Sequence, residues 1–358
     1  MDSSKQLAIK QVLEKTTALY KEDTPAISLA SERRVTSNVD MVVSTGIPAL
    51  DLVCAKAGPR SYGLPFGRQV EIFGNESMGK TTLLLQTAAN VQKLGGIVYW
   101  IETEGGLDLV YAKKLGVNIE ELIVSQPDYA EQVFEESETF IKAIGGLKQK
   151  VPAAILWDSA AATQTKQEME GDFGQAHIAS FGRFISQAER KIITSLSKRK
   201  ILFCFTNQTR TKINTFGYGS NISTYGEGTF KFYDSIKLQL SNRAQIKEGN
   251  EVVGNNVAIK IVKNKCMPTS FYVTEPIRLI KGEGFVYGSG LLNALEMKGR
   301  IDRKKSKGWI YLNCDGMKRK YTEKFRETKL LSMIKEDDKF KSYCEKLIFV
   351  SKKKKIKK

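Results

Sequence analysis

Apolar and polar positions change period repeatedly along this chain, from the two-residue period of strands to the 3.6-residue period of helices. Apolar runs of strand type lie at residues 69–73, 97–101, 122–124, 153–157 and 201–206. Stretches with helical spacing separate most of these runs, and this alternation is typical of parallel strands joined by helical crossovers. We therefore predict an α/β fold over residues 41–290, with a mostly parallel twisted sheet flanked by helices.

The amino-terminal end departs from this pattern. Apolar positions at helical spacing predict an amphipathic helix over residues 6–20, and alternation predicts a short strand with Ile27 and Leu29 on one side. So small a unit cannot bury its own apolar face. We therefore expect residues 1–40 to dock on the rest of the fold or on a neighbouring subunit.

The carboxyl-terminal end is rich in positive charge. Residues 291–350 form brief basic segments that predict a small C-terminal α+β domain, and the like charges of residues 351–358 predict a disordered basic tail. The formal net charge of the chain is +17, of which the six lysines of the tail supply six. Because the body stays basic without them, we expect a polyanionic partner, most often nucleic acid.

The remaining composition excludes several classes of protein. The five cysteines are scattered without a CxxC pair, and the chain has one histidine, so disulfide scaffolds, zinc sites and histidine-based triads are disfavoured. No apolar run reaches membrane-spanning length, and the first residues lack the layout of a secretory signal. We expect a soluble, intracellular protein with no membrane partner.

A phosphate-binding motif lies between the apolar run at 69–73 and a helical stretch. It consists of Gly74, Asn75, Glu76, Ser77, Met78, Gly79, Lys80 and Thr81, followed by Thr82. This is the P-loop pattern, in which glycines turn the backbone N–H groups toward one anion at the start of a helix. We expect Lys80 to reach the β- and γ-phosphates and Thr81 to hold Mg²⁺. A glycine-rich turn that binds nothing would not need a lysine followed by two hydroxyls.

Carboxylates follow two of the other predicted strands. Asp158 ends the apolar run at 153–157 and is the second candidate Mg²⁺ ligand, the alternative being an aspartate that caps the next turn. Glu104 is our candidate for the group that activates water, whereas Glu102 has a structural interpretation. Asp108 and Tyr111 have i,i+3 spacing on a predicted helix and could face a bound base.

The strand at 201–206 leads through the amides of Asn207 and Gln208 into a long segment over residues 209–231. An amide at this place could sense the γ-phosphate. Basic and aromatic side chains alternate with glycines in the segment, namely Arg210, Lys212, Phe216, Tyr218, Tyr225, Phe230 and Lys231. This combination suits contact with single-stranded nucleic acid, and the alternative is an ordinary surface loop.

Ordered motifs from about residue 42 to residue 292 make the chain similar to the RecA family of ATP-dependent DNA strand-exchange recombinases. Besides the P-loop they include Ser44-Thr45-Gly46, Ser125-Gln126-Pro127-Asp128, Glu170-Gly171-Asp172, Lys231-Phe232-Tyr233 and Gly282-Glu283-Gly284. The resemblance implies a RecA-like P-loop ATPase core that uses ATP and Mg²⁺. It also implies a helical homo-oligomeric filament on single-stranded DNA, pairing with homologous duplex, and single-strand-binding or loader proteins as candidate partners.

The resemblance also implies roles for individual residues. Glu104 matches the family's catalytic glutamate and Gln208 its γ-phosphate sensor, while Lys263 and Lys265 match lysines that reach the ATP of a neighbouring subunit. The first DNA-binding loop corresponds to residues 169–178 and the second to residues 209–231. Arg183 would line the DNA side. Phe232 and the strand with Ile27 and Leu29 would lie at the subunit contact.

The resemblance implies a location in the bacterial cytoplasm or nucleoid. Three departures from the family pattern favour a divergent member, and are compatible with a phage-encoded one in the cytoplasm of a phage-infected cell. Gly105 stands where the bacterial proteins usually have histidine, and Glu227 replaces a glycine in the second loop. The tail at 351–358 is basic rather than acidic, and we expect it to aid DNA capture. The alternatives are a filament mediator or a hexameric DNA motor that does not exchange strands.

Overall fold

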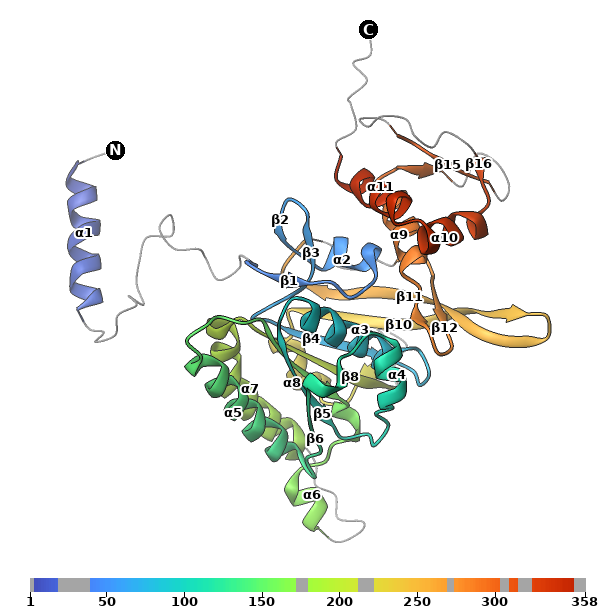
Figure 1. Cartoon of the computed structure of the whole chain (residues 1–358). Coiled ribbons are helices and arrows are strands. Elements are labelled where there is room, and N and C mark those ends of the chain that lie inside the picture. Colours follow the sequence, from blue (N-terminus) through green and yellow to red (C-terminus); the bar gives the residue numbers. More distant parts are fainter. Residues whose placement is uncertain are drawn as a thin grey trace, which may run out of the picture. The chain divides into compact units, whose positions relative to one another are not determined.

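The computed structural model describes residues 3–18, 39–171, 180–211, 222–268, 274–302, 309–314 and 324–350. The chain divides into two compact units, Met1–Asn38 and Val39–Lys358. The described part of the first unit consists mainly of helix α1 (Ser3–Thr17) (Figure 1). Its apolar side chains Leu7 and Val12 are exposed. The predicted strand with Ile27 and Leu29 lies outside the described residues.

The second unit is built on a large sheet, for which the described ranges supply ten strands. Its parallel part has the order β10-β4-β8-β7-β5-β6. These strands are β4 (Gln69–Gly74), β5 (Ile97–Glu102), β6 (Leu122–Ser125), β7 (Ala153–Asp158), β8 (Ile201–Thr211) and β10 (Ile236–Glu248). Strands β11 (Glu251–Asn264), β12 (Ile277–Ile280) and β13 (Gly284–Phe285) extend the sheet antiparallel beyond β10, and β9 (Ile222–Thr224) pairs with the end of β8. The predicted α/β class with a mostly parallel sheet is confirmed.

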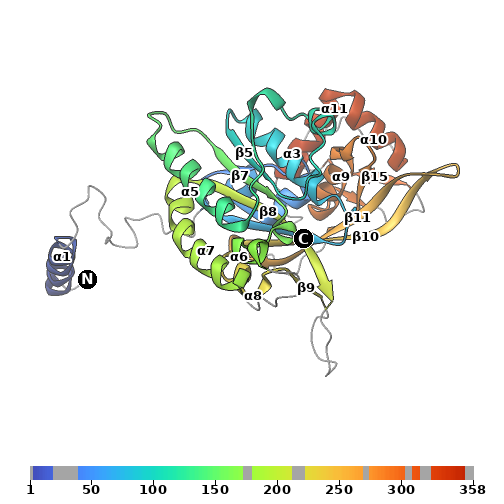
Figure 2. The ribbon, with the colours of Figure 1, turned by 90° about the horizontal axis from the view of Figure 1, so that it is seen from below.

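Helices cover both faces of this sheet (Figures 1 and 2). The helices between β4 and β10 in the chain are α3 (Lys80–Lys93), α4 (Leu109–Lys114), α5 (Ala130–Gly146), α6 (Lys166–Glu170), α7 (Ser180–Arg199) and α8 (Glu227–Tyr233), with 3₁₀ turns η1 (Ile119–Glu121) and η2 (Ala160–Ala162). Alternate residues of β7 pack on opposite faces: Leu156 joins the hydrophobic cluster of α3, whereas Ile155 and Trp157 join that of α5 and α7. Burial on both sides explains why the parallel strands read as continuous apolar runs in the sequence.

The ends of the second unit meet in a third hydrophobic cluster. Before β4 lie β1 (Val42–Val43), α2 (Pro48–Cys54), β2 (Ala55–Gly58) and β3 (Ser61–Pro65). After β13 lie α9 (Tyr287–Met297), β14 (Ile301–Asp302), β15 (Ile310–Leu312), β16 (Lys324–Phe325), α10 (Glu327–Glu336) and α11 (Asp338–Phe349). The cluster joins Leu291, Phe340 and Leu347 to Ala49 and Leu52 of α2. No helix in the described ranges is long and apolar enough to cross a membrane.

Candidate nucleotide and nucleic-acid sites

The predicted phosphate motif lies between the end of β4 and the start of α3. Gly79, at the helix start, has a left-handed backbone with φ of +84°. A Cβ atom there would lie 2.7 Å from Leu279 Cδ2, and one at Gly74 would lie 2.6 Å from the carbonyl oxygen of Leu240. Both positions therefore require glycine, and the backbone between them forms a tight cradle before a helix N-terminus.

A cleft of about 500 Å³ opens beside this cradle. It is lined by Glu76, Ser77, Gly79, Lys80, Thr81, Thr82, Glu104, Tyr111, Gly254, Asn255, Leu279, Ile280 and Lys281. Lys80 Nζ donates to the carbonyl oxygen of Asn75 over 2.8 Å, inside the loop. Burial lowers the pKa of Lys80, although the nearby carboxylates of Glu104 and Asp158 oppose the shift. The volume of the cleft lies within the range of small-molecule sites.

Asp158 and Thr81 meet at the edge of this cleft. Thr81 Oγ1 donates to Asp158 Oδ2 over 2.6 Å, and the hydroxyl of Thr206 donates to Oδ1. Burial raises the pKa of Asp158 to about 6, opposed by these two hydrogen bonds and supported by the charges of Glu104 and Glu102. A hydroxyl beside a buried carboxylate is a donor set that fits Mg²⁺, whose positive charge would favour the ionised form.

Two glutamates at the end of β5 have different surroundings. Glu102 is buried, and its Oε1 accepts hydrogen bonds from the backbone N–H groups of Glu104, Gly105 and Gly106 at 2.7 to 3.2 Å. These bonds shape the turn that presents Glu104 to the cleft. Gln208 Nε2 lies 3.4 Å from Glu104 Oε1, so the structure brings the candidate catalytic group and the candidate sensor together.

The two residues expected at the base differ in position. Tyr111 lines the cleft, and its hydroxyl lies 3.0 Å from Thr82 Oγ1. Asp108 is the N-cap of α4, where Oδ1 accepts from the N–H groups of Val110 and Tyr111. Asp108 thus has a structural task at the helix start. Its contact with a base stays a prediction.

Strand β8 continues past Gln208, the candidate sensor, into the candidate DNA-binding segment at 209–231. Thr209 pairs with Thr224 of β9, so the start of the segment is joined to its middle in a short antiparallel ladder. The guanidinium of Arg210 lies 4.6 Å from the ring centroid of Tyr225, and that ring packs on Phe181 at 4.3 Å. Lys212, Phe216 and Tyr218 lie outside the described residues, as do residues 172–178 of the first loop. Arg183 follows the first of these two stretches in the sequence, Lys231 follows the second, and both side chains are exposed.

Phe230 is a correction to the sequence-based expectation. We predicted that it contacts nucleic acid, but its side chain is fully buried. Its ring centroid lies 4.6 Å from that of Phe205 and 6.4 Å from that of Trp157, in the core beneath α8. The segment read as a loop forms a helix here, and Phe230 is on the face of that helix that packs against the sheet.

The lysine pair near the end of β11 also contacts α8. Lys263 Nζ donates to the carbonyl oxygen of Lys231, and Lys265 Nζ donates to that of Phe232 over 2.8 Å. These carbonyls belong to the last turn of the helix, where cations are stabilised. Burial and the neighbouring Lys265 lower the pKa of Lys263 to about 8. The role of both lysines toward a neighbouring subunit stays a prediction, as does that of the exposed Phe232.

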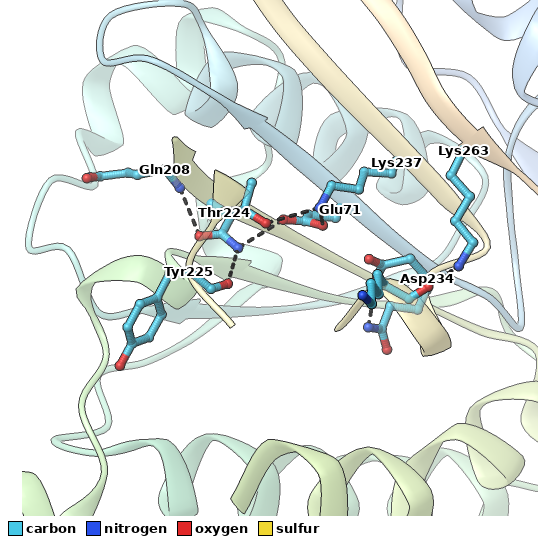
Figure 3. Close-up of polar contacts among 10 residues, drawn as sticks. Glu71, Gln208, Thr224, Tyr225, Asp234, Lys237 and Lys263 are labelled. Atoms are coloured by element: carbon cyan, nitrogen blue, oxygen red, sulfur yellow. Dashed lines mark hydrogen bonds and ion pairs between the residues drawn. The ribbon is translucent and has the colours of Figure 1, made fainter. Parts of the chain in front are cut away.

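The sequence analysis missed a buried polar cluster in the central strands of the large sheet. It contains Glu71 of β4, Asn207 of β8 and Lys237 of β10, together with Thr224 and the backbone of Tyr225 (Figure 3). One signal could have found it, since Glu71 and Lys237 are charged residues inside otherwise apolar strand runs.

Comparisons with known proteins agree with this geometry. The RecA N-terminal domain family matches residues 8–286 of the chain. Protein RecA of Syntrophobacter fumaroxidans is 42% identical over 255 residues, which cover 71% of this chain and 68% of that protein. Protein RecA of Marinobacter nauticus is 38% identical over 76% of this chain and 74% of its own length, and that of Bdellovibrio bacteriovorus is 38% identical over 77% and 69%. The glycine-dependent cradle before α3 and these matches lead to one conclusion: the chain belongs to the RecA family.

Proposed function

We propose that the chain is a DNA recombinase. With ATP and Mg²⁺ it forms a helical filament on single-stranded DNA, pairs that strand with homologous duplex and exchanges strands. ATP hydrolysis, stimulated by DNA, releases the filament. The family membership and the phosphate cradle support the nucleotide part of this proposal, and the net charge of +17 supports the polyanionic partner.

In this proposal each residue of the cleft has one task. The backbone of the P-loop and Lys80 bind the phosphates, while Thr81 and Asp158 would hold Mg²⁺. The ion, when bound, neutralises charge on the phosphates. Glu104 orients and deprotonates the attacking water.

A second set of residues acts between subunits and on DNA. Lys263 and Lys265 reach the ATP of the neighbouring subunit and stabilise charge in its transition state. Arg183, Arg210 and Lys231 bind the DNA backbone, and aromatic side chains of the second loop stack on bases.

One observation carries the proposal, the contact between Gln208 and Glu104. Gln208 Nε2 approaches the carboxylate in the cleft at 3.4 Å, and β8 runs on from Gln208 to Thr211, where it pairs with β9. A single strand therefore connects the cleft with the start of the proposed DNA-binding loop and, through its pairing with β9, with the middle of that loop. A protein that only hydrolysed ATP would not need this connection.

A strand-exchange assay tests the proposal. Full-length protein is mixed with single-stranded DNA and homologous duplex, with and without ATP, and a heterologous duplex is the control. We expect joint molecules that require both ATP and homology. DNA-stimulated ATP turnover without joint molecules would overturn the proposal in favour of a mediator or motor.

A further inference from the structure

Glu71 lies at the centre of the sheet, in the strand that leads into the P-loop, and its side chain is fully buried. Its Oε1 accepts a hydrogen bond from Asn207 Nδ2 over 2.9 Å, and its Oε2 pairs with Lys237 Nζ at 2.8 Å. Strand β4 lies between β8 and β10, so one carboxylate holds side chains from both neighbouring strands (Figure 3).

Asn207 and Lys237 also bind residues of the second loop. Asn207 Nδ2 donates to the carbonyl oxygen of Tyr225 over 2.8 Å, and Lys237 Nζ donates to Thr224 Oγ1 over 3.0 Å. Thr224 and Tyr225 lie in the second half of the loop at 209–231, just before α8. Both Asn207 and Lys237 are therefore bound to Glu71 and to this short segment.

The amide of Asn207 joins this segment to the sensor. Its Oδ1 accepts from the backbone N–H of Gln208 over 2.9 Å, while its Nδ2 uses its two hydrogens on Glu71 and on Tyr225. A flipped amide would break all three bonds, because an N–H cannot accept and an oxygen cannot donate. The carboxylate of Glu71 thus fixes the orientation in which Asn207 contacts both the sensor and the loop end.

A buried ion pair is costly to desolvate and is weak evidence for a purely stabilising role. A second carboxyl, Asp234, lies near Glu71. Burial, followed by the charge of Glu71, raises the pKa of Asp234 well above the usual value, and Gln69 Nε2 donates to its Oδ1 over 3.0 Å. Lys237 is the cation that pairs with Glu71, at 2.8 Å.

We propose that Glu71 is a positioning residue that couples the nucleotide state of the cleft to the second loop, through Asn207 and Lys237. When Gln208 moves in response to the γ-phosphate, it moves Asn207, and Asn207 moves the backbone of Tyr225. Lys237, which is paired with Glu71, holds Thr224 through its hydroxyl. This inference rests on the proposed function, because it assigns a nucleotide sensor and a DNA-binding loop to the two ends of the network.

The variant Glu71→Gln tests this role by measuring coupling rather than activity. The affinity of the full chain for fluorescent oligo(dT) is measured with Mg²⁺ and either ADP or a slowly hydrolysed ATP analogue. The ratio of the two affinities is the coupling between the sites, which is commonly about 5- to 150-fold. We expect Glu71→Gln to reduce this ratio by about 10-fold or to near one, with analogue affinity in the absence of DNA changed by less than about 3-fold.

Thermodynamic reciprocity supplies a second reading of the same coupling. Oligo(dT) should raise the affinity of the wild-type chain for the analogue by the same factor, and should not do so for the variant. A merely structural role would weaken both affinities and leave their ratio unchanged. The matched control is Glu189→Gln, a second fully buried carboxyl whose polar neighbours are Gln69 and Asp234. It should keep the wild-type ratio.

The outcomes separate the two proposals. A wild-type ratio near one would overturn the proposed function and this inference with it. A wild-type ratio above one that persists in Glu71→Gln would overturn this inference alone. Should the single variant fail to fold, Glu71→Gln/Lys237→Met removes both charges of the pair together, and the same ratio decides.

Discussion

Strand β4 connects two groups of charged side chains with opposite character. At its carboxyl end Lys80 and Glu104 line an open cleft. In its middle Glu71 pairs with Lys237 where both side chains are almost fully buried. The open group is available to a ligand, whereas the charges of the closed group pair with each other. Burial, more than charge, separates residues that bind from residues that set the geometry of the segments around them.

The largest effect should come from breaking the open group with Lys80→Ala. The variant removes the cation that approaches the phosphates, and we expect nucleotide binding to fall by about 100-fold or more, with loss of ATP-supported filaments. Titration with a fluorescent ATP analogue and electron microscopy with single-stranded DNA measure the two effects. Lys93→Ala, an exposed lysine at the other end of α3, is the control. Filaments of normal length with Lys80→Ala would contradict the assignment.

A narrower break in the open group is Glu104→Gln. Loss of the general base should lower ATP turnover by about 100- to 1,000-fold, while ATP and DNA still bind, because the amide keeps the size of the side chain. Steady-state hydrolysis and equilibrium binding to oligo(dT) separate these effects. The exposed Glu120 provides the matched control as Glu120→Gln. Normal turnover in Glu104→Gln would refute its role.

The smallest effect concerns Glu189 of α7, a buried carboxyl outside the closed group, and it depends on pH. Burial raises the pKa of Glu189 from 4.5 to about 8. Because only the unfolded chain ionises this group between those values, the stability it contributes is fully present below pH 4.5 and is lost as pH rises toward 8. Glu189→Gln removes this dependence. The difference in the free energy of unfolding, Glu189→Gln minus wild type, should therefore be a few kcal/mol more positive at pH 8 than at pH 5.

Urea unfolding at the two pH values measures this difference. The wild-type chain at each pH is the reference, so that Asp234, which also has a raised pKa, contributes to both proteins. An equal difference between the variant and wild type at pH 5 and pH 8 would show that Glu189 stays ionised in the folded chain. That result would place water or a cation beside this carboxyl.

The sequence predicted the open group well because of where its parts lie. The P-loop occupies consecutive residues between a strand and a helix, so its pattern is local. Asp158, Glu104 and Gln208 are distant in sequence. Asp158 is the last residue of β7, Glu104 follows β5, and Gln208 is the last residue of β8 that pairs with β4, so all three lie where the carboxyl ends of parallel strands meet. Motif and topology together therefore predicted which residues gather around the cleft.

The closed group could not be predicted in the same way. Glu71, Asn207 and Lys237 meet only because β4 lies between β8 and β10, and spacing along the chain does not give this order. The prediction that Phe230 contacts nucleic acid was wrong for a related reason. Its segment has the glycines and polar residues of a loop, and only the packing of α8 on Phe205 and Trp157 makes it part of the core.

The buried guanidinium of Arg300 makes the end of the chain unusually suitable for trimming. Its Nη2 donates to the carbonyl oxygen of Val350, the residue just before the tail at 351–358. A chain that stops at Val350 would carry its terminal carboxylate at this point, and a neutral acceptor would become an anion on Arg300. The shortened protein should keep its C-terminal packing. Any loss of duplex binding on trimming would then report the tail lysines rather than a damaged fold.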